Sequence, residues 1–143
     1  MTGLESDLHP VIRIVALLSE DHDRSVTLRL CYANQWDVFF VSEVAEAREA
    51  IDRLKPQVVL FDRDLGGHDW RSAMSPLASC SNGACIFLVS KVLDDNLWSE
   101  VVSNGGYEVL HKPLREDQVF RATKLAWTYW KSADPPVTIR SRR

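Results

Sequence analysis

The sequence has few of the features that would place a protein in a membrane, outside the cell or on nucleic acid. No apolar run approaches the roughly 20 residues of a membrane-spanning helix, and the start of the chain lacks the apolar core of a secretion signal. The three cysteines fit neither a disulfide framework nor a zinc-ligand pattern. A net charge of -3 argues against a nucleic-acid-binding face, which is usually strongly basic. These absences favour a soluble protein of the cytoplasm that binds neither membrane nor nucleic acid.

Glycine is also missing from the turn after the first apolar run. That turn, residues 19–23, reads Ser-Glu-Asp-His-Asp. A turn that cradles the phosphates of a nucleotide or a flavin contains glycines, and an acidic turn repels phosphate unless a metal ion intervenes. The sequence therefore gives little support to a nucleotide- or flavin-binding enzyme.

Five short apolar runs alternate with five helical patterns along the 143 residues, a length that suits one domain. We expect strands at residues 11–18, 36–41, 58–61, 85–89 and 108–110, and helices at about 23–34, 43–55, 70–78, 94–103 and 115–131. This alternation predicts an α/β fold, a doubly wound five-stranded parallel sheet with helices on both faces. We expect residues 1–10 to be a leader, 11–131 the domain, and 132–143 a basic tail or the start of a linker.

The chain is organised around the third apolar run, Val58 to Phe61, which leads directly into Asp62. The run is short and rich in β-branched residues, as in a central strand that is covered on both faces. Ligands of open parallel sheets bind beyond the carboxyl ends of the strands, where Asp62 is expected. One interpretation makes Asp62 a reactive carboxylate; the other makes it an ordinary cap of the following turn.

Other expected strands also end in polar residues that could reach the same edge of the sheet. These residues are Glu20 and Asp21 after the first strand, Ser90 after the fourth and Lys112 after the fifth. Carboxylate oxygens are the ligands that Mg²⁺ prefers, and a lysine with a hydroxyl can bind a phosphoryl group. Together these residues describe a carboxylate nucleophile, Asp62, that attacks phosphorus while a metal ion reduces the repulsion between two anions.

In these features residues 11–131 resemble the receiver domain of two-component response regulators. The resemblance rests on Val58 to Asp62 with Leu65 and Gly67, on Ser90, and on Gly105-Gly106 followed by Leu110-His111-Lys112-Pro113. It implies a flavodoxin-like sheet with the strand order 2-1-3-4-5. It also implies that a histidine kinase or phosphotransfer protein phosphorylates Asp62, and that Ser90 and Lys112 contact the phosphoryl group. Mg²⁺ would bind to Glu20, Asp21, Asp62 and the backbone carbonyl of Asp64.

The same resemblance implies how the protein would signal. It would catalyse its own phosphorylation and dephosphorylation without being a turnover enzyme. Its downstream protein target would bind to a surface formed by residues 94–103, 108–110 and 115–131, and a homodimer is an open alternative. The phosphoryl group would favour one of two existing arrangements of this surface.

Several residues depart from the pattern of the family. The acidic pair after the first strand is matched by Glu20 and Asp21, the assignment we prefer, or by Ser19 and Glu20, which leaves one metal carboxylate fewer. Lys91 stands at a place that is normally small, and Val109 replaces an aromatic residue that moves in many receivers. These departures support an alternative hypothesis, a degenerate receiver that binds proteins without being phosphorylated.

Overall fold

The computed structural model describes residues 11–65, 69–80 and 83–132, the last three by their backbone alone. These residues form one parallel sheet with the strand order β2-β1-β3-β4-β5, which confirms the expected fold class and order. The strands are β1 (Arg13–Leu17), β2 (Asp37–Phe40), β3 (Val58–Asp62), β4 (Cys85–Ser90) and β5 (Glu108–His111). The helices are α2 (Asp21–Asn34), α3 (Val44–Leu54), α4 (Trp70–Ser79), α5 (Leu97–Ser103) and α6 (Glu116–Ser132). The expected leader at 1–10, residues 133–143 of the expected tail and the turn at Gly66-Gly67 lie outside the described residues.

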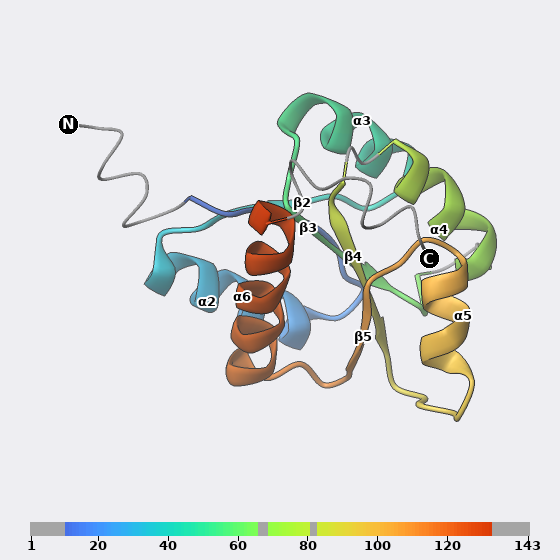
Figure 1. The fold of residues 1–143 in the computed structure, drawn as a ribbon. Helices are drawn as coiled ribbons and strands as arrows, with labels where there is room; N and C mark the ends of the chain where they lie inside the picture. The colour runs from blue at the N-terminus through green and yellow to red at the C-terminus, as the bar shows by residue number, and fades with distance from the viewer. Residues whose placement is uncertain (1–10, 66–68, 81–82, 133–143) are drawn as a thin grey trace.

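The helices form two layers, one on each face of the sheet (Figure 1). Helices α2 and α6 cover one face, and α3, α4 and α5 cover the other. Because successive side chains of a strand point to opposite faces, each central strand supplies both layers. Val58 and Leu60 of β3 pack toward α2 and α6, whereas Val59 and Phe61 pack toward α3, α4 and α5. This explains why the run is continuously apolar.

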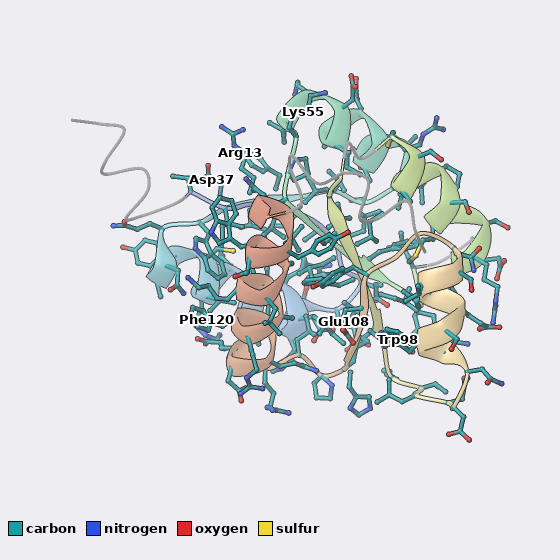
Figure 2. All side chains as sticks on the ribbon, viewed as in Figure 1. Arg13, Asp37, Lys55, Trp98, Glu108 and Phe120 are labelled. Carbon is teal, nitrogen blue, oxygen red and sulfur yellow. The ribbon has the colours of Figure 1, made fainter. Side chains whose placement is uncertain are left out.

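Side chains fill the space between the sheet and both helical layers (Figure 2). Every residue of β3 and β4 is buried. On the layer of α2 and α6, the rings of Trp36 and Phe120 are stacked with their centroids 5.8 Å apart. The protein thus has two apolar cores separated by the sheet, as a doubly wound fold requires.

Two helices start at other places than the sequence pattern indicates. Helix α2 begins at Asp21, earlier than expected, and α5 begins at Leu97, later than expected. Before α5 the chain makes a turn in which the N–H of Asn96 donates to Oδ1 of Asp94 and the N–H of Leu97 donates to the backbone carbonyl of Asp94, each at 3.2 Å. The aspartate side chain competes for backbone N–H groups, and this delays the start of the helix.

The segment Gly105-Gly106 explains how β5 can follow α5 so closely. Gly105 adopts a left-handed conformation with φ of 98° just after the helix. A Cβ atom on Gly106 would lie 2.5 Å from Cγ1 of Val101 and 2.7 Å from Sδ of Met74. Only glycine fits where the chain presses against α4 and α5.

The parallel order brings the carboxyl ends of all five strands to one edge of the sheet. Asp62 at the end of β3 pairs in register with Val89 of β4, and Ser90 pairs with His111 of β5. Within the described part of the chain, no helix has the length and apolar character needed to cross a membrane.

Candidate functional site

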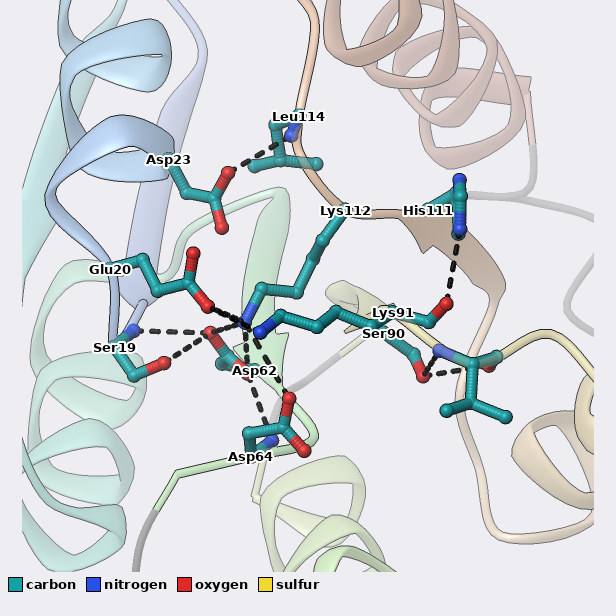
Figure 3. A network of polar contacts seen from close by, with 11 residues as sticks. Ser19, Glu20, Asp23, Asp62, Asp64, Ser90, Lys91, His111, Lys112 and Leu114 are labelled. Atoms are coloured by element: carbon teal, nitrogen blue, oxygen red, sulfur yellow. Dashed lines mark hydrogen bonds and ion pairs between the residues drawn. The ribbon is translucent and has the colours of Figure 1, made fainter.

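Asp62 is the buried centre of the polar residues at the carboxyl edge of the sheet (Figure 3). Its side chain is fully covered, yet both oxygens accept hydrogen bonds. Oδ1 accepts from the N–H of Asp64 at 2.8 Å. Oδ2 accepts from the N–H and the hydroxyl of Ser19 at 3.1 and 2.8 Å. The loops after β1 and β3 therefore fix the orientation of this carboxylate.

Lys112 reaches Asp62 from the loop between β5 and α6. Its Nζ lies 3.0 Å from Oδ2 and 3.2 Å from Oδ1 of Asp62. The lysine side chain is 1% exposed, and its backbone N–H donates to the carbonyl of Ser90 at 2.9 Å. The same ammonium lies 3.1 Å from Glu20 and 3.7 Å from Asp64. Three carboxylates thus surround one buried cation.

The electrostatics of the site keep this pair charged. Burial by itself raises the pKa of Asp62, but the Asp64 N–H, the Lys112 ammonium and Ser19 outweigh it, so the pKa lies below its ordinary value. Burial likewise lowers the pKa of Lys112, but hydrogen bonds to Asp62 and Glu20 raise it above its ordinary value. The Lys112 ammonium also lowers the pKa of Glu20. At neutral pH the site contains ionised carboxylates and an ionised lysine.

The structure does not place Asp21 at the site, contrary to the preferred assignment of the acidic pair. The Asp21 side chain is 96% exposed and forms an ion pair with Arg24, one helical turn further along α2. Ser19 and Glu20 contact the Asp62–Lys112 pair instead. Because α2 begins at Asp21, that side chain points outward from the first helical turn. The geometry therefore matches the second assignment, with one carboxylate fewer.

Ser90 lies at the end of β4, as expected, but its hydroxyl serves its own loop. Oγ donates to the carbonyl of Val92 at 2.8 Å and accepts from the N–H of Val92 at 3.1 Å. Such local bonds are typical of a serine before a tight turn. The expected role of Ser90 at a phosphoryl group stays a prediction that requires its hydroxyl to rotate.

Two residues of α2 hold the loop that carries Lys112, a function that the sequence pattern did not predict. Oδ1 of the buried Asp23 accepts from the N–H of Leu114 at 2.9 Å, and Nε2 of His22 lies 3.2 Å from the Leu114 carbonyl. The second oxygen of Asp23 has no hydrogen-bond partner among the described residues. Acidic residues are common in the first turn of a helix, so the sequence does not single out Asp23. Only the folded structure reveals its contact with Leu114.

The acidic residues suit magnesium only in a mode that uses few protein ligands. No three His, Cys, Asp or Glu residues are grouped for metal binding within residues 11–65, 69–80 and 83–132. Mg²⁺ often uses one or two carboxylates, with waters and phosphate oxygens as its other ligands. Glu20 and Asp62 lie close enough to contact the same Lys112 ammonium, at 3.1 and 3.0 Å, so two carboxylates stand together at this edge of the sheet. This two-carboxylate donor set fits Mg²⁺.

Comparisons with known proteins show what the fold of the chain is similar to. No family model matches the chain, and no curated protein matches it by sequence. Three similar solved structures are the receiver domain of a diguanylate cyclase from Desulfovibrio desulfuricans G20, a CheY-like response regulator receiver protein from Methanospirillum hungatei JF-1 and the chemotaxis protein CheY4 of Vibrio cholerae.

The sequence identities to these three structures are low, whereas the folds agree over most of each chain. The first is 20% identical with a TM-score of 0.72 and covers 85% of this chain and 97% of its own. The second is 14% identical with a TM-score of 0.72 and covers 85% of this chain and 98% of its own. The third is 12% identical with a TM-score of 0.73 and covers 81% of this chain and 98% of its own. The chain has the flavodoxin-like fold of response regulator receiver domains.

Proposed function

We propose that the protein is a receiver domain that accepts a phosphoryl group on Asp62. The observation that carries this proposal is the ionised Asp62 carboxylate at the end of β3, with the Lys112 ammonium 3.0 Å away. An Asp62 oxygen attacks phosphorus of a phosphohistidine, the new O–P bond forms, and the P–N bond breaks. The electron pair of the broken P–N bond stays on the imidazole nitrogen of the donor protein, which is a histidine kinase or a phosphotransfer protein. Transfer of this kind depends mainly on position and charge neutralisation.

Each residue around Asp62 has a defined part in this proposal. Lys112 neutralises charge on the incoming phosphoryl oxygens, and the Asp64 N–H holds the carboxylate in place. When bound, Mg²⁺ would supply further charge neutralisation and would be held by Glu20, Asp62 and the backbone carbonyl of Asp64. Asp21 is no longer included in this ligand set, since it faces Arg24.

Phosphorylation requires a local rearrangement, because Asp62 is fully covered. One Asp62 oxygen must lose the hydroxyl of Ser19 or the ammonium of Lys112 before it can attack. The hydroxyl of Ser90 must leave Val92 to reach the phosphoryl group. We infer a shift between two populations of the β4 and β5 loops, the second favoured by the phosphoryl group.

The surface that passes the signal on is formed by α5, β5 and α6. Trp98 and Val102 of α5 are 53% and 40% exposed. Exposed aromatic residues are enriched at protein contacts. A downstream protein, or a second copy of this chain, would bind to this surface in the cytoplasm, without membrane or nucleic acid.

A second candidate function is a binding module that works without phosphorylation. It is favoured by the full set of hydrogen bonds on Asp62, by the Ser90 hydroxyl that is engaged in its own loop, and by the outward position of Asp21. In this case the Asp62–Lys112 pair would be a structural element of the sheet edge.

Intact mass measurement separates the two candidates. The protein is incubated with Mg²⁺ and acetyl phosphate, and in parallel with Mg²⁺ and beryllofluoride while its tryptophan fluorescence is recorded. The proposal expects a gain of one phosphoryl group and a fluorescence change, both lost in Asp62→Asn. The absence of both responses in the unmodified chain would refute phosphorylation and favour the binding module.

A further inference from the structure

An ion pair between Lys91 and Glu20 crosses the sheet edge above Asp62. Nζ of Lys91 lies 3.4 Å from Oε2 of Glu20 (Figure 3). Lys91 follows β4 and Glu20 follows β1, and β3 lies between these two strands. Neighbouring strands are about 4.8 Å apart, so the pair spans about two strand spacings. The strand that it crosses is the one that ends in Asp62.

The backbone at Lys91 is anchored on both sides, so the origin of the long side chain is well defined. Ser90 and Val92 are joined through the Ser90 hydroxyl at 2.8 and 3.1 Å. The carbonyl of Lys91 lies 3.1 Å from Nε2 of His111 on the neighbouring strand. The side chain therefore needs no loop movement to reach the first loop or to leave it.

Glu20 offers the same oxygen to two lysines that differ in how firmly they are held. Its Oε2 lies 3.1 Å from Lys112 and 3.4 Å from Lys91. Lys112 is 1% exposed and also binds Asp62, whereas Lys91 is 63% exposed and forms its ion pair with Glu20 alone among the described residues. The two ammonium groups repel each other, and an exposed ion pair is weak. Lys91 is the partner that Glu20 can exchange for a cation from solvent.

We propose that Lys91 competes with a divalent cation for Glu20 and thereby lowers the affinity of the site for Mg²⁺. This inference rests on the proposed function, in which Glu20 and Asp62 hold the metal ion. The Lys91 ammonium opposes metal binding at Oε2, because a second cation beside the same carboxylate oxygen is repelled by the first. Removal of the Lys91 charge also removes a like charge beside the incoming cation.

The test measures Mg²⁺ binding by isothermal titration calorimetry on the full chain and on Lys91→Met, which keeps most of the length of the side chain but not its charge. The dissociation constant is expected to fall about threefold to tenfold, the range for loss of an exposed ion pair and a nearby like charge. The ratio should approach one at high salt, which screens exposed charges. Equal or weaker binding by Lys91→Met overturns the inference.

A matched control is Lys55→Met. Lys55 also forms an exposed ion pair, with Asp52 at 3.7 Å, and lies on the other side of the molecule from the site (Figure 2). Lys55→Met changes the net charge by the same amount as Lys91→Met. If Lys55→Met also bound Mg²⁺ more tightly, the effect would be one of general charge, and the inference would be overturned. In a Glu20→Gln background, Lys91→Met should change the affinity less than it does in the unmodified chain, because only the repulsion between Lys91 and the cation remains.

Phosphoryl mass gain separates failure of this inference from failure of the proposed function. If the chain and Lys91→Met bind Mg²⁺ equally and both are phosphorylated, the inference alone is wrong. If no variant binds Mg²⁺ and none gains mass, both are wrong.

Discussion

Replacing Lys112 by methionine tests whether the buried ion pair determines the stability of the site. The change keeps most of the side-chain volume but removes the cation 3.0 Å from Asp62, whose carboxylate is fully covered. Loss of one partner of a buried ion pair costs about 3–5 kcal/mol, because the remaining charge is uncompensated. Ser19 and Asp64 still donate to Asp62, so we expect the lower limit, about 3 kcal/mol, in the free energy of unfolding.

The pH dependence gives this prediction a distinct signature. In the unmodified protein the pKa of Asp62 is lowered, so the stability that its charge contributes is complete above its ordinary pKa of 3.8 and is lost as the pH falls through the lower folded value. Without Lys112 the uncompensated burial should raise the pKa of Asp62 above that of the unfolded chain. The variant should then lose less stability than the unmodified protein between pH 7 and pH 4.

Urea unfolding followed by tryptophan fluorescence measures both effects. The double variant Lys112→Met/Asp62→Asn is the control, since it removes the buried charge and should regain most of the lost stability. A Lys112→Met variant within about 1 kcal/mol of the unmodified protein at pH 7, with no change in its pH profile, would refute this account of the buried pair.

Three further predictions follow from the fold. Asp23→Ala should lower the free energy of unfolding by about 2 kcal/mol in urea titrations, because the buried N–H of Leu114 loses its acceptor. Gly106→Ala should cost about 1–3 kcal/mol in the same measurement, because the added Cβ would lie 2.5 Å from a side chain of α5. Among the cysteines, only the half-buried Cys80 should react rapidly with a thiol reagent at pH 8, because burial raises the pKa of the other two thiols to about 12. Cys80→Ser should abolish this fast phase, and a remaining fast phase would contradict the burial of the other two.

The alternation of strands and helices and the position of Asp62 were accessible from the sequence because both depend on local patterns, whereas the strand order was implied only by the resemblance to receiver domains. A continuous apolar run such as Val58 to Phe61 is stable only when both faces are covered, so it predicts a central strand. An acid directly after such a run lies at the carboxyl edge of a parallel sheet, where the structure places Asp62. The position of Lys112 followed from the same rule.

The start of α2 shows what such patterns leave open. Residues 19–23 contain several polar side chains, and the sequence favours no single one of them for the site. Which of them faces Asp62 depends on where the first helical turn begins, and this is decided by packing of α2 against the sheet and the loop after β5. The structure places Glu20 at the site together with Ser19, and not with Asp21 as preferred from the sequence.

The sequence by itself determined the alternation of strands and helices, the two-sided core and the strand end at which Asp62 lies, because hydrophobic periodicity is a property of neighbouring residues. The tertiary structure decided which side chains meet there: Ser19 on Asp62, Lys112 between three carboxylates, and Lys91 across the edge to Glu20. These contacts join residues far apart in the chain, and their geometry depends on strand register and helix starts that no local pattern specifies.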